Sequence, residues 1–275
     1  MTHILPFTPK RPVLPSQPLP RPQAAAAPVS SNATAIDLSG KLKCLFFIGR
    51  GRIGKTTAIR VIAETMAERG GEAVVAAVDP VNRSLRAFLD GVAEPKSTDP
   101  EGVKDWLYQL LQSLIIDRRS GLIDLGGGDT SLTALLADMP DLADIMADGG
   151  VEPVAIHIVG TDPHDLTPLA TTEAAGFRPR ATAIVLNEVH GRRATDFDQI
   201  LQHPSYQQAI DRGAIQLWMP LLTPDAARVI DANNWHYLDV KGKLGPFHAS
   251  SVHQWLRRVG EDFAPISSWY PEAAQ

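Results

Sequence analysis

One short stretch limits the fold of this chain more than any other, because it joins an apolar run, a glycine-rich turn and an amphipathic segment. Residues 43–49 are apolar nearly throughout, as expected for a strand buried on both faces of a sheet. The segment GRGRIGKT, residues 49–56, follows directly and satisfies the pattern G-x-x-x-x-G-K-[ST]. Apolar residues then repeat at helical spacing over residues 54–69. The stretch predicts a strand–loop–helix unit whose loop wraps phosphate.

This glycine-rich loop (residues 49–56) contains the groups that phosphate binding requires. Backbone N–H groups from Gly51 to Lys55 can surround a β-phosphate, and the helix adds the positive end of its dipole. Lys55 can bridge the β- and γ-phosphates, the Thr56 hydroxyl can bind Mg²⁺, and Thr57 is expected near the α-phosphate. The alternative is a glycine-rich turn with a surface lysine. The strand before the loop and the helix after it favour a nucleotide site.

Short apolar runs alternate with amphipathic segments from residue 41 onward, which is typical of a parallel sheet with helices between its strands. We expect an α/β fold with a doubly wound, mainly parallel sheet flanked by helices, of the P-loop NTPase type. Strands are predicted at residues 43–49, 73–79, 121–125, 153–160, 181–187 and 214–219. Helices are predicted at residues 54–69, 102–117, 130–147, 164–175, 195–212, 224–233 and 247–263.

The first 40 residues differ in composition from the rest of the chain. They contain eight of the 22 prolines and an AAAA run, with almost no periodic apolar pattern. We interpret residues 1–40 as a Pro-rich disordered arm and residues 41–275 as a single P-loop ATPase domain. The arm has a net charge of +2 and the domain −7, which together give the chain's −5. Such a domain has no general electrostatic attraction for nucleic acid.

Cysteine and histidine usage excludes several kinds of site. Cys44 is the single cysteine, so one chain can form no internal disulfide and no Cys-pair metal or iron–sulfur site. His157 lies in an apolar run and is interpreted as a core residue. His248 and His253 are five residues apart, which does not place them on one helix face. No apolar run approaches the ~20 residues that span a bilayer, and no signal-peptide pattern is present. A cytoplasmic location is therefore expected.

The glycine-rich loop resembles the deviant Walker A motif of the ParA/MinD ATPases, which belong to the SIMIBI class of P-loop proteins. The family form is K-G-G-x-G-K-[ST]-[ST], and Arg50 stands here at the position of the family's signature lysine. In that family the lysine reaches the phosphates of the partner subunit in a nucleotide-sandwich dimer. The resemblance implies that Arg50 does the same with a guanidinium that can grip two oxygens. Arg52 replaces the family's second glycine and so changes the loop surface.

Two aspartates match acidic positions of the same family. Asp79 ends a predicted strand, where the family has an aspartate that orients or activates the attacking water, although Ala77 replaces the first member of the usual D-x-D pair. The segment DPVNRSL that begins there resembles switch I. Asp124 precedes three glycines, as in Walker B and switch II, which implies a role in holding Mg²⁺ through water. The alternatives are that Asp79 only turns the chain and that Walker B ends at Asp117 instead.

Two later segments complete the resemblance, which spans about residues 43–235. TAIVLNEVHGR resembles the family strand with a base-reading asparagine, here Asn187, and LWMPLLTPDAARVID resembles the strand whose loop closes over adenine after a proline, here Pro220. The catalytic residues implied are Lys55, Asp79 and Arg50, and the metal residues are Thr56 and Asp124. The nucleotide-binding residues implied are Gly49, Arg50, Gly51, Arg52, Ile53, Gly54, Lys55, Thr56, Thr57, Asn187 and Pro220.

The resemblance implies an ATPase that binds ATP and Mg²⁺, forms a homodimer on ATP, and partitions or positions a plasmid, chromosome or other cargo. An adaptor or centromere-binding type of protein is the expected partner, non-specific DNA is a further candidate, and a membrane is not expected. The alternatives are a P-loop kinase or ligase for a small molecule, and a nucleotide-binding adaptor with little turnover. For DNA, two local basic groups stand out: Arg178, Arg180, Arg192 and Arg193, and Lys241, Lys243, Arg257 and Arg258.

Overall fold

A computed structural model describes residues 34–79, 85–128 and 130–273 of the chain. Its sheet has six strands in the order β2-β3-β1-β4-β5-β6, and every neighbouring pair is parallel. The strands are β1 (Leu42–Ile48), β2 (Val74–Ala77), β3 (Gly121–Asp124), β4 (Val151–Val159), β5 (Ala181–Asn187) and β6 (Ile215–Met219). The chain winds outward from β1 to one edge, then returns beside β1 and winds to the other edge. The predicted doubly wound α/β fold is confirmed.

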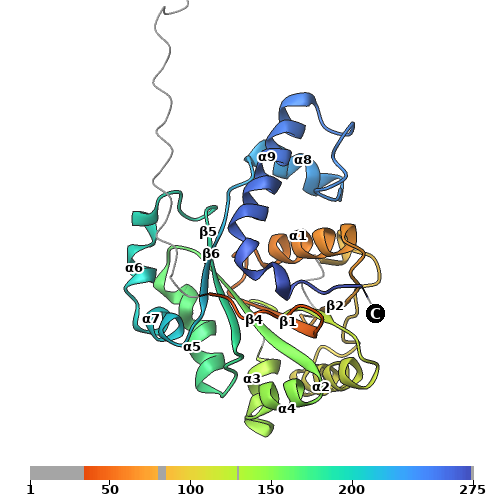
Figure 1. Ribbon diagram of the computed structural model, residues 1–275, viewed down its shortest axis with the longest axis vertical. Helices are drawn as coiled ribbons and strands as arrows, with labels where there is room; N and C mark the ends of the chain where they lie inside the picture. The colour runs from red at the N-terminus through yellow and green to blue at the C-terminus, as the bar shows by residue number, and fades with distance from the viewer. Residues whose placement is uncertain (1–33, 80–84, 129, 274–275) are drawn as a thin grey trace, which may run out of the picture.

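Helices cover both faces of this sheet (Figure 1). On one face lie α1 (Lys55–Glu68), α8 (Pro224–Ala232) and α9 (Pro246–Asp262). On the other face lie α2 (Pro100–Ile116), α3 (Ser131–Asp138), α4 (Leu142–Asp148), α5 (Thr167–Ala174), α6 (Asp198–Leu201) and α7 (Pro204–Asp211). Strand β1 supplies both cores by alternation, because Leu45 and Phe47 pack on the α1 side while Cys44 and Phe46 pack on the α2 side. The central strand is thus buried on both faces, as its apolar run indicates.

Three predicted helices differ from the structure where prolines interrupt them. The helix predicted at residues 130–147 is two helices, α3 and α4, separated at Met139 and Pro140. The helix predicted at residues 195–212 is a 3₁₀ turn followed by α6 and α7, and Pro204 begins α7. The helix predicted at residues 164–175 begins as the 3₁₀ turn η2 (Pro163–Leu166) before α5. Proline lacks an N–H donor and restricts the preceding residue, so each break follows from the sequence.

The boundary predicted between the arm and the domain lies too late in the chain. Leu38 is 1% exposed and belongs to the α1-side core. The Trp269 indole Nε1 donates to the Ile36 carbonyl over 2.8 Å, and the Gly40 N–H donates to the Glu272 carboxylate over 3.0 Å. Residues 35–40 are therefore part of the packed domain, whereas residues 1–33, the rest of the predicted arm, lie outside the described residues.

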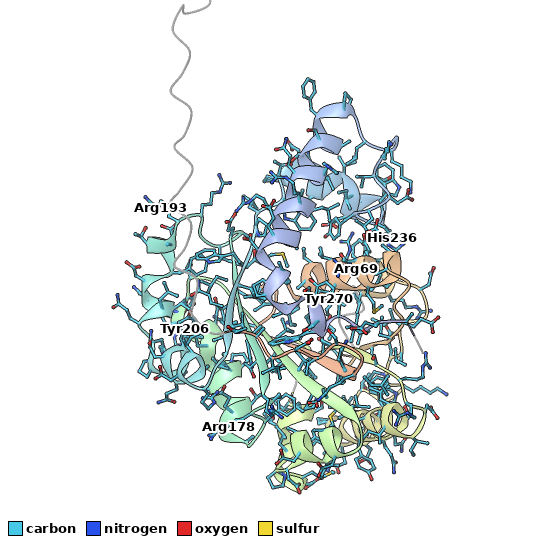
Figure 2. The ribbon with its side chains drawn as sticks, viewed as in Figure 1. Arg69, Arg178, Arg193, Tyr206, His236 and Tyr270 are labelled. Carbon is cyan, nitrogen blue, oxygen red and sulfur yellow. The ribbon has the colours of Figure 1, made fainter. Side chains whose placement is uncertain are left out.

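The segment after α9 packs across the end of β1 that is remote from the glycine-rich loop. The fully buried Lys43 ammonium donates to the Tyr270 carbonyl over 3.0 Å and pairs with Glu272 at 3.2 Å. Arg69, just after α1, lies 5.6 Å from the Tyr270 ring centroid, and Figure 2 shows the two side chains next to each other. These contacts join the C-terminal segment to β1 and α1. In the described part of the chain, no helix is long and apolar enough to cross a membrane.

Candidate nucleotide site

The glycine-rich loop connects β1 to α1 at the carboxyl edge of the sheet, beside the point where the winding direction reverses. This is the edge at which open α/β sheets bind ligands. The loop passes so close to β4 that a side chain on Gly49 would place its Cβ 2.7 Å from the Ile158 carbonyl oxygen. Gly54 has a φ of 105°, and a Cβ there would overlap the Asn187 amide. Both outer glycines of the motif are thus required by the fold, independently of any ligand.

Lys55 begins α1 and folds back over the loop. Its ammonium donates to the carbonyl oxygens of Gly49 at 2.8 Å and Arg50 at 2.9 Å, and the residue is only 8% exposed. The chain therefore places the lysine charge over the loop, beside the pocket described below. A buried ammonium at this place would attract an anion that enters the loop.

Asp79 and Asp124 meet beside the loop because β2 and β3 are neighbours. Asp124 ends β3 opposite Ala77, the last residue of β2, and Asp79 follows two residues later. Burial raises the pKa of Asp124 to about 6; the Lys55 charge opposes this rise and the Asp79 charge adds to it. The Asp124 Oδ1 atom is buried and has no hydrogen-bond partner among the described residues. Such an atom fits a site for a cation or for a water bound to one.

An open pocket unites the loop with these two carboxylates. We call it the loop pocket; its volume is ≈ 380 Å³. Its lining residues come from the loop, the start of α1, and the ends of β2 and β3: Gly51, Arg52, Gly54, Lys55, Thr56, Ala77, Asp79, Asp124, Gly126 and Gly127. The arrangement can hold an anion on the loop with a cation beside Asp124. Within the described ranges, no group of three or more His, Cys, Asp or Glu residues forms a metal site, so a cation would need phosphate or water ligands as well.

The triple-glycine segment (residues 126–128) closes one side of the loop pocket. A Cβ on Gly126 would lie 2.7 Å from the Asp79 Cβ, and one on Gly127 would overlap the Gly51 backbone. A Cβ on Gly128 would meet no atom of the residues that the structure describes within 4 Å. Two of the three glycines are therefore explained by direct packing of the segment on Asp79 and on the loop. The alternative Walker B at Asp117 is wrong, because Asp117 caps the C-terminal end of α2 and lies on no strand.

Arg50 and Arg52, the two arginines inside the loop, have different surroundings. The Arg50 Nη1 atom pairs with Asp165 at 3.1 Å and Asp162 at 3.3 Å, both in or next to η2, and its side chain is 46% exposed. Arg50 is therefore held within its own chain in this structure. Arg52 has a φ of 62°, in the left-handed region where glycine is favoured, which accounts for the glycine of the family motif at this position.

Asn187, Thr57 and Pro220 have roles in the fold that the sequence did not indicate. The buried Asn187 side chain donates to the Ile53 carbonyl over 2.7 Å and accepts from the Val189 N–H over 3.1 Å. It thus supports the loop from β5, while its role in reading a base stays a prediction. The Thr57 hydroxyl bonds to Tyr237, and the Pro220 carbonyl accepts from the Trp255 indole over 2.7 Å. Only Asp79 and Leu85 of the segment DPVNRSL are among the described residues.

The basic groups considered for DNA are divided in space or paired with acidic residues within one chain. Arg178 precedes β5 and Arg193 follows it, so the two residues lie at opposite ends of this strand. Figure 2 shows them far apart. In the second group, Lys243 pairs with Asp239, Arg257 with Glu261 at 2.7 Å, and Arg258 with Glu188 at 2.8 Å. Each of these three cations has an acidic neighbour, which weakens any combined positive field. DNA binding stays a prediction.

Comparisons with known proteins add a general resemblance. No protein-family model matches the sequence, and no curated protein matches it. Among solved structures, it is similar to the signal recognition particle receptor FtsY from Elizabethkingia anophelis in complex with GDP, with 17% identity and a TM-score of 0.45 over 66% of this chain and 58% of that one. It is also similar to cell division protein FtsY from Thermotoga maritima (12% identity, TM-score 0.44, 64% and 62%). A third similar structure is chloroplast FtsY from Physcomitrella patens (14%, 0.44, 66% and 59%).

This chain spans about three fifths of the length of the FtsY structures it matches. The strand order and the parallel pairing of all six strands define the fold.

Proposed function

We propose that this chain is a P-loop nucleotide-binding protein of the ParA/MinD type, which binds ATP–Mg²⁺, dimerises on ATP and hydrolyses it slowly. The observation that carries the proposal is a single pocket in which the glycine-rich loop, Lys55, Asp79 and Asp124 converge. Phosphate binding by loop N–H groups at a helix N-terminus is a general property of this geometry. The nucleotide-binding part of the proposal depends on this site and not on the similarity to solved structures.

Each lining residue has a chemical role in this proposal. The loop N–H groups and Lys55 bind the β- and γ-phosphates, for which Lys55 exchanges its present carbonyl partners. Thr56 and Asp124 would hold Mg²⁺, directly or through water, and the buried Asp124 Oδ1, which has no hydrogen-bond partner among the described residues, fits this use. The bound ion would neutralise charge on the phosphates. Asp79, next to Asp124, orients the attacking water.

Dimerisation and cargo are the finer parts of the proposal and rest on the family resemblance. Arg50 would leave Asp162 and Asp165 and reach the phosphates of a second copy of the chain. The Asp162 pair is half-exposed on both sides, and such a pair contributes only about 0–1 kcal/mol. Asp165 is buried, so its carboxylate would lose a charged partner and keep the hydrogen bond from the Gly160 N–H, and the cost of the exchange lies mainly in this pair. The cargo would be plasmid, chromosomal or other cellular material, recognised through an adaptor or a centromere-binding protein.

The ion pairs of Arg50 favour a second candidate, a nucleotide-binding adaptor with little turnover. In that case Arg50 stays bound to Asp162 and Asp165 and never acts on a second chain. The two candidates share the nucleotide site and differ in dimerisation and in hydrolysis. An ATPase rate that does not rise with protein concentration would favour the adaptor.

Thermal unfolding with nucleotide tests the shared part of both candidates. At a ligand concentration 100-fold above Kd, ATP–Mg²⁺ should add ~2.7 kcal/mol to the free energy of unfolding. Lys55→Ala should remove most of this stabilisation, whereas Lys96→Ala, at an exposed position outside the loop pocket, should retain it. GTP–Mg²⁺ in a parallel series determines the preferred purine. Absence of any shift with either nucleotide in the parent protein would refute the nucleotide site.

A further inference from the structure

A second pocket lies on the other side of the triple-glycine segment. Its volume is ≈ 410 Å³, within the range of small-molecule sites. It is bounded by the end of β1, by α3 and by α5, and we call it the threonine pocket. It shares Gly126 and Gly127 with the loop pocket, so two separate spaces meet at one wall of backbone without side chains.

The lining of the threonine pocket is apolar at its base and hydroxylated elsewhere. Ile48, Leu125 and Leu132 are buried core side chains that supply the apolar surface. Thr130, Thr133, Thr167 and Thr171 add hydroxyl groups, and none of these four is buried. Such a combination suits a small molecule with an apolar body and a polar head, since apolar walls supply affinity and a few polar groups fix orientation.

Arg50 supplies the permanent charge in the described lining of the threonine pocket. Its two carboxylate partners, Asp162 and Asp165, lie outside that lining and contact one end of the guanidinium. Both ion pairs of Arg50 use Nη1, so the described residues leave Nη2 and Nε without a partner. The Nε–Nη2 edge of a guanidinium can bind a carboxylate through two charge-assisted hydrogen bonds.

Gly128 provides an independent indication that this space is kept open. A Cβ on Gly128 would meet no atom of the described residues within 4 Å. Gly128 lines the threonine pocket and is exposed. This part of the pocket wall is therefore open to a ligand that approaches the backbone.

From these four observations, we propose that the threonine pocket binds a small organic carboxylate with an apolar body. The carboxylate contacts the free N–H groups of Arg50, and the body lies on Ile48, Leu125 and Leu132. Gly128 allows the ligand to approach the triple-glycine segment. This site is distinct from the loop pocket and needs neither ATP nor dimerisation.

Hexanoate, with hexanol as its uncharged counterpart, is a suitable probe pair for the full chain. Binding is measured by saturation-transfer NMR without nucleotide, and Kd values on the order of 1 mM are expected for so small an acid. Hexanol should bind at least about 10-fold more weakly, because it cannot form charge-assisted hydrogen bonds with Arg50 as a carboxylate can. Arg50→Gln should remove this difference between acid and alcohol.

Two tryptophan variants locate the binding. Thr171 is exposed on α5 and lines the pocket, so Thr171→Trp should fill the space without disturbing the core and weaken hexanoate binding at least about 10-fold. Ala134→Trp, at an exposed position of α3 outside the lining, should leave the Kd unchanged. Equal binding of acid and alcohol, unchanged binding in Thr171→Trp, or no binding of hexanoate at concentrations about 10-fold above the expected Kd would each overturn the proposal.

Discussion

Asp124 shows at the scale of a single residue how a candidate metal site lowers the stability of the free protein. Its pKa is raised from 3.8 to about 6, mainly by burial. A carboxyl group whose pKa is higher in the folded state favours folding when protonated, and this contribution is lost as the pH rises from about 4 through 6. At neutral pH the free protein therefore contains a buried negative charge beside Asp79, and the Lys55 charge offsets it in part.

Replacing this charge should stabilise the free protein in a pH-dependent way. Asp124→Asn should exceed the parent in free energy of unfolding by up to about 3 kcal/mol at pH 7, and the difference should vanish near pH 4. Denaturant unfolding at both pH values measures it. Asp117→Asn, at the exposed end of α2, is the control and should show no such difference. A variant that is less stable than the parent at pH 7 would contradict the raised pKa.

The triple-glycine segment packs on two other parts of the chain, Asp79 after β2 and the glycine-rich loop. A methyl group at position 127 would overlap the Gly51 backbone, whereas one at position 128 would project into open space. Gly127→Ala should therefore displace the segment from the loop and weaken nucleotide binding at least about 10-fold, while Gly128→Ala should retain it. Isothermal titration with the preferred nucleotide compares the two variants. Equal affinities would show that the segment does not form the wall of the loop pocket.

The elements were more predictable from the sequence than the contacts between them. Each predicted strand overlaps an observed strand, because an apolar run between turn residues is a local signal. The predicted helices were too long where Pro140 and Pro204 interrupt them, although proline is itself a local signal. Local patterns also gave the glycine-rich loop and the acidic positions of Asp79 and Asp124, which line one pocket.

Partners that are distant in the chain could not be predicted in this way. The ion pairs of Arg50 join residues 112 and 115 positions apart, and they depend on the register between β1 and β4. The hydrogen bond from the Asn187 side chain to the Ile53 carbonyl likewise joins residues 134 positions apart in the sequence. The threonine pocket was also missed, because its wall requires α3 and α5 to be placed beside the loop.

For the molecule as a whole, the contacts of residues 35–40 set the point where the domain begins. Deleting residues 1–33 should leave the free energy of unfolding unchanged, since their Pro-rich composition, with few periodic apolar residues, predicts little contribution to a core. Deleting residues 1–40 removes the buried Leu38 and should cost about 2–5 kcal/mol, the range for large losses of core side chains. The prediction is checked by comparing the melting temperatures of the two truncated proteins. Equal values would show that Leu38 contributes nothing to the domain.

The central claim is that two nucleotide-loaded chains meet and that Arg50 acts between them. Light scattering with ATP–Mg²⁺ on an Asp79→Ala background, which is meant to block hydrolysis, tests it most directly. On this background we predict a dimer when Arg50 is unchanged and also for Arg50→Lys. Arg50→Ala should be a monomer that still binds ATP, because two triphosphates repel unless a cation lies between them. ADP should give monomers throughout. A dimer of Arg50→Ala with ATP, or a parent chain that stays monomeric, would contradict the account.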